Sequence, residues 1–161
     1  MKIKDVVVED FLNYKEPSML IVSALCDWKC CTEAGLDISV CQNASLVSSP
    51  SKIISDETLL RMFCSDPITK AIVVGGLEPM LQIYELLSLI GCFRAHGENS
   101  PFVIYTGYYE REIPDHLQRL RQYRNIIVKF GRFIPNCLPR FDQVLGVMLA
   151  SNNQYAVQLT P

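Results

Sequence analysis

The sequence predicts an α/β fold built on a mostly parallel sheet. Short runs of branched apolar residues recur along the chain and have the length of buried strands. Several of these runs end at a glycine or a polar pair and are followed by a stretch with helical periodicity. Strands that alternate with helices are typical of parallel sheets with helical crossovers. A closed eight-unit barrel usually needs about 250 residues, so this chain could form only part of one.

Size and composition indicate a globular protein. The chain of 161 residues is most simply one domain, 49% of its residues are hydrophobic and its net charge is −2. This charge provides no basic surface for nucleic acid, and no apolar run has the length of a membrane span. The first residues lack the apolar core of a signal peptide. We therefore expect a cytoplasmic protein without nucleic-acid or membrane partners, in which grouped cysteines bind metal or do redox chemistry.

The first part of the chain predicts two strands and an irregular segment. Residues 3–9 and 19–25 predict strands, and residues 13–18 between them predict a turn. Residues 44–51 are rich in serine and poor in charge, which predicts a loop. Ser55, followed by two acidic residues, has the character of a helix N-terminus, so a helix is expected to begin there.

The rest of the chain repeats a unit of strand and helix. Pro79 suits the first turn of a helix, and a second, amphipathic helix is expected over residues 110–124. Strands are predicted at residues 71–74, 102–105, 125–130 and 144–149, the last of these being the final strand.

A group of cysteines follows the second predicted strand. Cys26, Cys30, Cys31 and Cys41 lie within sixteen positions. Thiolates this close repel one another unless a soft cation shares their charge, so a metal ion or an iron–sulfur cluster is the first hypothesis. From the cysteines alone, a structural zinc site with four ligands, Cys31 among them, is about equally well supported.

The predicted strands end in residues suited to a binding site. Gly75-Gly76, Thr106-Gly107 and Gly131-Arg132 each follow a predicted strand, as the cysteine group does. Ligands of parallel α/β sheets gather at the carboxyl ends of the strands. These four segments are therefore expected to meet at one edge of the sheet.

Four motifs occur in the order found in one known family. They are Cys26, Cys30 and Cys41-Gln42-Asn43; the segment Gly75–Gln82; the strand ends Tyr105–Tyr108 and Gly131–Phe133; and the segment Ala150–Gln154. In these motifs, which cover nearly the whole chain, the sequence resembles the small radical S-adenosylmethionine (SAM) activases. The resemblance is greatest to the activating proteins of anaerobic ribonucleoside-triphosphate reductase.

The chain also departs from the family pattern. Ten residues separate Cys30 from Cys41, where the family has two, and Cys31 is an additional cysteine. Asn43 favours Cys41 as the third ligand, with Cys31 as the alternative. Leu77 is inserted before Glu78, and Lys129-Phe130 stands where the family usually has an acidic residue.

The resemblance implies a fold, two cofactors and a partner. The fold would be a partial (β/α) barrel of radical SAM type, with a mostly parallel curved sheet and helices on its outer face. Cys26, Cys30 and Cys41 would bind a [4Fe–4S] cluster and leave one iron open for SAM. The partner would be a glycyl radical enzyme, anaerobic ribonucleoside-triphosphate reductase above all, and a low-potential donor such as flavodoxin or ferredoxin would supply the electron.

The resemblance also implies which residues contact SAM. Gly75 and Gly76 would let the backbone approach its methionyl part, and Glu78 would accept from its ammonium group. The remaining candidates are polar or charged residues at later strand ends: Thr106, Lys129, Arg132, Ser151 and Asn153. Without the resemblance, Glu78 is better explained as part of the first turn of a helix.

Two other functions stay open at the level of sequence. One is a small radical SAM enzyme that acts on a small molecule or a peptide. The other is a non-catalytic module that binds metal or a partner protein. Cleavage of SAM by the reduced protein would exclude the second.

Overall fold

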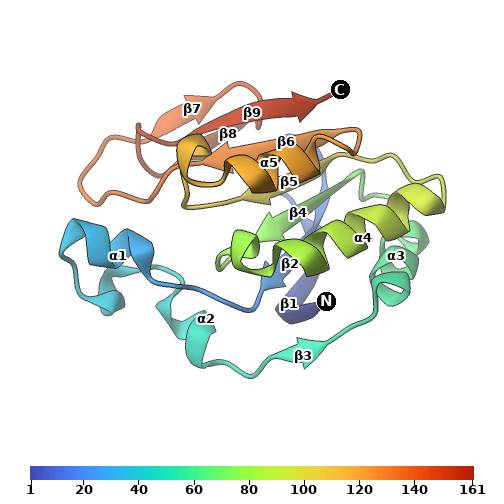
Figure 1. The fold of residues 1–161 in the computed structure, drawn as a ribbon, viewed down its shortest axis with the longest axis horizontal. Helices are drawn as coiled ribbons and strands as arrows, with labels where there is room; N and C mark the ends of the chain where they lie inside the picture. Colours follow the sequence, from blue (N-terminus) through green and yellow to red (C-terminus); the bar gives the residue numbers. More distant parts are fainter.

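The computed structural model describes residues 1–161 and shows an α/β fold around a seven-stranded sheet (Figure 1). The strands are β1 (Lys2–Asp10), β2 (Ser18–Ser23), β3 (Lys52–Ile53), β4 (Ala71–Gly75), β5 (Phe102–Tyr105), β6 (Ile126–Phe130), β7 (Arg140–Asp142), β8 (Val147–Leu149) and β9 (Tyr155–Thr160). The α-helices are α1 (Lys29–Ala34), α2 (Ala44–Ser48), α3 (Asp56–Ser65), α4 (Ile83–Ala95) and α5 (Pro114–Leu120). Three short 3₁₀ helices are η1 (Ile38–Val40), η2 (Pro79–Gln82) and η3 (Glu110–Glu112).

The sheet is parallel at its centre and antiparallel at its edges. Its strand order is β3-β1-β2-β4-β5-β6-β9, and β7 and β8 form a separate two-stranded sheet. The strands β2, β4, β5 and β6 run parallel, with Leu20 paired with Val73, Val73 with Val103, and Val103 with Ile127. The outer strands β1, β3 and β9 each pair antiparallel with their inner neighbours. The carboxyl ends of the four parallel strands therefore lie at one edge.

The prediction of a partial (β/α) barrel of radical SAM type is wrong. Three of the six strand pairings in the sheet are antiparallel, so the sheet is mixed rather than mostly parallel. Only 32% of the residues are helical. Two connections between strands explain why the sheet is mixed. The seven residues between β1 and β2 are too few for a parallel crossover, and the chain between β6 and β9 forms a hairpin instead of a helix.

Side chains of the central strands alternate between two apolar layers. Ile72 and Val74 face the larger core, which is completed by α3, α4 and α5. Val73 and Val103 face a smaller core on the opposite side of the sheet, which Tyr14 and residues of the β7–β8 hairpin segment cover. Helices thus cover one face only, and the hairpin covers the other.

Most of the predicted elements are confirmed, but some differ, and β3, β7 and α1 were not predicted. The predicted loop at 44–51 contains the short helix α2, and the predicted helix over 110–124 is divided into η3 and α5. Pro114 causes that division, because the residue before a proline is disfavoured in the helical region, and Ile113 has φ −132° and ψ 41°. The final strand is β9, which the sequence analysis missed. None of the helices combines the length and the apolar character that a membrane crossing needs.

Candidate cysteine-lined site

A pocket of about 190 Å³ lies at the carboxyl ends of the parallel strands. One side is formed by residues that follow β4, β5 and β6, and the other by the residues between β2 and α2. We call the second part, residues 26–43, the cysteine segment. In Figure 1 its helix α1 lies at the left, beside the end to which the arrow of β4 points. The convergence of strand ends that was expected from the sequence is therefore present.

Glu78 organises the strand side of the pocket. Its carboxylate is 7% exposed and accepts hydrogen bonds from the Met80 N–H at 3.0 Å, the Thr106 hydroxyl at 2.8 Å and the Gly107 N–H at 2.8 Å. These bonds join the end of β4 to the end of β5. Burial raises the pKa of Glu78 to about 7, although the three hydrogen bonds act in the opposite direction.

Lys129 brings a buried positive charge to the same pocket. It lies on β6, its side chain lines the pocket, and its Nζ donates to the Gly131 carbonyl at 2.9 Å. No carboxylate forms an ion pair with it. Burial lowers the pKa of Lys129 to about 8. Since an ammonium group has three donors, two remain for a ligand.

Four thiols line the pocket from the cysteine segment, those of Cys26, Cys30, Cys31 and Cys41. Cys30 lies beside the strand side: a Cβ added to Gly107 would lie 3.0 Å from its Sγ and 3.5 Å from Glu78 Oε2. Burial raises the pKa of the Cys26 thiol to about 11 and also raises that of Cys30. These thiols are therefore neutral at pH 7 until a cation displaces their protons.

Two contacts tie the cysteine segment and the residue before it, Leu25, to the end of β4. The Glu78 N–H donates to the Leu25 carbonyl at 2.7 Å, and the Asn43 Nδ2 donates to the Gly76 carbonyl at 2.6 Å. Gly76 has φ +79°, a conformation that suits glycine, and an added Cβ would lie 2.6 Å from Val22 Cγ1. Asn43, the residue that favoured Cys41 over Cys31 as the expected third ligand, thus holds the segment against the strand end.

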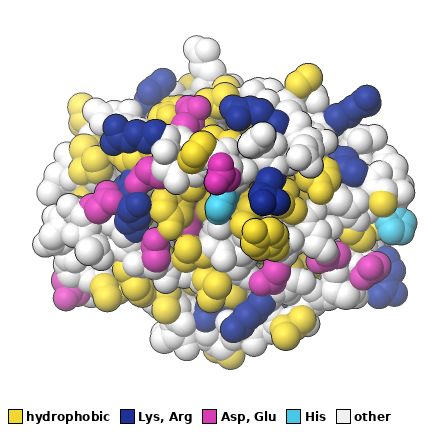
Figure 2. Space-filling model, in the orientation of Figure 1, with side chains coloured by type: hydrophobic (Ala, Val, Ile, Leu, Met, Phe, Trp, Pro, Cys, Tyr) yellow, Lys and Arg dark blue, Asp and Glu magenta, His cyan; other side chains and the backbone are white.

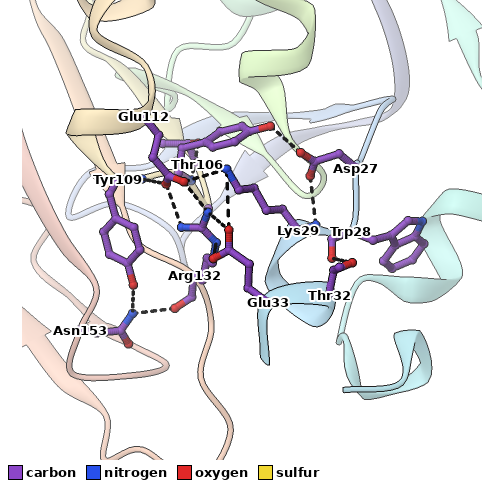
Figure 3. Close-up of polar contacts among 12 residues, drawn as sticks. Asp27, Trp28, Lys29, Thr32, Glu33, Thr106, Tyr109, Glu112, Arg132 and Asn153 are labelled. Carbon is purple, nitrogen blue, oxygen red and sulfur yellow. Dashed lines mark hydrogen bonds and ion pairs between the residues drawn. The ribbon is translucent and has the colours of Figure 1, made fainter. Parts of the chain in front are cut away.

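Ion pairs tie helix α1 of the cysteine segment to η3 and to the residues after β6. Glu112 Oε1 lies 2.7 Å from both Lys29 Nζ and Arg132 Nη2 (Figure 3). Arg132 also bonds Glu33, with 2.9 Å from its Nε to Oε2. We call these four residues, Lys29, Glu33, Glu112 and Arg132, the ionic clamp. Figure 2 shows acidic and basic side chains intermixed at the left of the molecule, where α1 lies.

The structure brings together most of the residues that were expected at the site. Those that line the pocket are Cys26, Cys30, Cys31, Cys41, Gly76, Glu78, Thr106, Lys129 and Arg132. The guanidinium of Arg132 is directed to Glu112 and Glu33, so its observed contacts are within the protein.

Three of the expected residues do not line the pocket. Gly75 lies inside the sheet, where an added Cβ would be 3.0 Å from the Cβ of Tyr105. Ser151 is fully buried, and its hydroxyl accepts from the Ile134 N–H. Asn153 donates to the Arg132 carbonyl at 2.8 Å and to the Tyr109 hydroxyl. All three support neighbouring segments.

The sequence analysis missed several residues of the site. Tyr108 donates from its hydroxyl to Asp27 at 2.5 Å, which connects the segment after β5 to the cysteine segment. Its position in the Tyr105–Tyr108 motif could have indicated that Tyr108 belongs to the site. No sequence pattern indicated that Glu112 belongs to the site, because its partners Lys29 and Arg132 are 83 and 20 residues away in the chain.

The thiol groups of the pocket are the kind of donor that binds an iron–sulfur cluster or a zinc ion. Four soft thiols line one pocket, and the absence of a side chain at Gly107 leaves room beside Cys30. However, no group of three or more Cys, His, Asp or Glu side chains is close enough to hold a metal ion. Binding therefore requires the thiols to move toward one another. The short elements α1 and η1, which carry few buried residues, allow such a movement.

Comparison of the chain with protein-family models, curated protein sequences and solved structures finds no match in any of the three.

Proposed function

We propose that this chain is a radical SAM activating enzyme that generates a glycyl radical on a partner enzyme, with anaerobic ribonucleoside-triphosphate reductase as that partner. The observation that carries the proposal is the shared pocket: four thiols lie opposite a buried carboxylate and a buried ammonium group at the ends of parallel strands. The proposal rests on this site and on the sequence motifs, and not on the barrel that the resemblance implied.

Cys26, Cys30 and Cys41 would hold the [4Fe–4S] cluster, with Cys31 as the alternative third ligand. With the cluster bound, the chemistry supplied would be the one-electron reductive cleavage of SAM, which would provide the radical needed to remove a hydrogen atom from the partner's glycine. A low-potential donor such as flavodoxin or ferredoxin would provide that electron.

The charged groups of the strand side suit an amino acid moiety. A carboxylate has about four acceptor sites and Glu78 uses three of them within the protein, so one remains for an ammonium group. The two free donors of Lys129 suit a carboxylate. Both groups are buried, and this strengthens their interaction with a ligand of opposite charge. The methionyl part of SAM has one group of each kind.

The test is anaerobic reconstitution with iron and sulfide, followed by electron paramagnetic resonance of the reduced protein with and without SAM. We expect a [4Fe–4S]⁺ signal that changes when SAM is added, together with formation of 5′-deoxyadenosine. A protein that assembles no cluster and retains zinc instead would contradict the proposal.

A structural zinc site is the second candidate, because Cys31 lines the same pocket and would complete a set of four thiols. In that case one zinc ion per chain should survive purification, and replacing Cys31 should release it. Under the first proposal, Cys31→Ala keeps its iron.

A further inference from the structure

A second cavity, of about 270 Å³, adjoins the cysteine-lined pocket. The two cavities share six lining residues: Cys41, Asn43, Tyr105, Lys129, Phe133 and Gln154. The second one begins at the last residues of the cysteine segment, 41–43, and is bounded by the β1–β2 turn and the β7–β8 hairpin. Together they form one cleft, and we call its outer part the hairpin groove.

The wall of the hairpin groove includes a strand edge. Four consecutive residues, Val147 to Ala150, line it. Val147, Met148 and Leu149 form β8, and since successive side chains of a strand point to opposite faces, three consecutive strand residues that line one groove place the edge of the strand toward it. The strand β8 pairs with β7 alone. On its other edge, no backbone hydrogen bond to another segment of the protein is present.

Exposed apolar side chains stand on both sides of the groove. Leu12, in the β1–β2 turn, is 80% exposed, and Met148, on β8, is 60% exposed. Both line the groove. An unpaired strand edge between exposed apolar side chains has the features that bind an extended peptide, since the edge supplies backbone hydrogen bonds and the apolar side chains accept alternate residues.

We propose that the hairpin groove binds an extended polypeptide segment of the partner, which adds to β8 as a third strand. The main chain of the bound segment would then lead past Lys129 toward the cysteine-lined pocket. A residue without a side chain can approach the thiols of that pocket most closely. The identity of the partner as a glycyl radical enzyme rests on the proposed function, whereas the groove and its preference for a polypeptide rest on the geometry of β8.

Titration of the full-length ¹⁵N-labelled chain with the blocked peptide acetyl-Ala-Val-Gly-Val-Ala-amide tests this proposal by NMR. The amide signals of Val147–Ala150 and Leu12 should shift at millimolar peptide. The same peptide with both valines N-methylated should bind about tenfold more weakly, because it loses two backbone donors. Shifts confined to other parts of the molecule, or equal binding of the two peptides, would overturn the proposal.

Two matched variants sharpen the result. Leu12→Asp should weaken peptide binding several-fold, whereas Ile53→Asp should not; Ile53 is 84% exposed but lies on β3, at the far edge of the sheet. If the signals of Val147–Ala150 instead change with protein concentration in the absence of peptide, a second copy of the chain occupies the groove and the proposal fails. The titration uses neither cluster nor SAM. Loss of peptide binding therefore overturns the groove alone, and loss of cluster assembly overturns the proposed function alone.

Discussion

Glu78, on the strand side of the cysteine-lined pocket, and Glu33, on helix α1 of the cysteine segment, are held in different ways. Glu78 is 7% exposed and accepts three hydrogen bonds from the ends of β4 and β5. The side chain of Glu33, in the cysteine segment, is 49% exposed and is held by ion pairs with Lys29 and Arg132. Buried hydrogen bonds resist rearrangement, whereas exposed ion pairs contribute little and are screened by salt.

The two sides of the pocket therefore differ in how much they depend on a ligand for their structure. The strand side is formed by the core of the protein and is complete without a ligand. The cysteine segment is built from short helical turns with few buried residues, so a bound metal group would supply much of its stability. The strand side would therefore recognise the bound ligand, and the cysteine segment would change its conformation to hold the metal group.

The largest effect is expected from the cysteines themselves. Cys26→Ala, Cys30→Ala and Cys41→Ala should each abolish cluster assembly, because each removes one of the three proposed ligands, while Cys31→Ala should leave the iron content largely unchanged. Iron and sulfide analysis after anaerobic reconstitution measures this. Loss of iron in Cys31→Ala together with its retention in Cys41→Ala would reverse the ligand assignment.

A smaller effect is expected from the pH dependence of Glu78. Its pKa rises from 4.5 in the unfolded chain to about 7 in the folded protein, so folding favours the protonated form. That contribution is fully present below pH 4.5 and is lost as the pH rises to about 7, a loss on the order of 3 kcal/mol at about 1.4 kcal/mol per pH unit.

Glu78→Gln should remove this pH dependence of the free energy of unfolding. Urea denaturation at intervals between pH 4.5 and 8 measures it, and Glu98→Gln, at a carboxylate outside the pocket, serves as the control. The same slope in the Glu78→Gln variant and the unmodified protein would show that Glu78 ionises as it does in water.

Two glycines allow a direct comparison of how tightly the strand side and the cysteine segment are packed. Gly76→Ala should destabilise the protein by about 3 kcal/mol, since φ is +79° and the added Cβ would lie 2.6 Å from Val22 Cγ1. Gly35→Ala, in the cysteine segment, should cost only about 1 kcal/mol: φ is +63°, but no atom lies within 4 Å of the added Cβ. Thermal or urea unfolding measures both, and equal costs would contradict the contrast between the two sides.

The smallest effect is expected at the ionic clamp. Glu112→Gln removes the partner shared by Lys29 and Arg132 and should destabilise by about 1 kcal/mol, with faster amide hydrogen exchange confined to residues 29–34. The difference should shrink at about 1 M salt, where charges are screened within roughly 3 Å. Lys52→Gln, which breaks the exposed pair with Asp5, should change neither quantity. Uniformly faster exchange throughout the protein would mean that the clamp stabilises the whole fold.

Local patterns were enough to locate most elements and most of the pocket. The branched run at residues 71–74 predicted β4, and the acidic residues after Ser55 predicted α3, whose N-terminus the Ser55 hydroxyl caps by accepting from the Thr58 N–H. The glycines and polar residues after β4, β5 and β6 were expected at one edge of the sheet, and Gly76, Thr106 and Arg132 line a common pocket there. These features depend on residues close together in the chain, and such interactions are visible as sequence patterns.

Strand direction, the clamp and the hairpin groove depended on contacts between distant segments. Nothing in the segment from 131 to 154 indicates that it folds back as a hairpin over the sheet and leaves β9 to pair antiparallel with β6. Glu112 meets Lys29 across 83 positions, and the edge of β8 becomes a groove wall only beside the β1–β2 turn. Composition and periodicity describe one segment at a time, whereas packing decides which segments face each other. The sequence alone therefore determined the elements and the chemical character of the site, and tertiary structure decided the mixed sheet and the shape of the cleft.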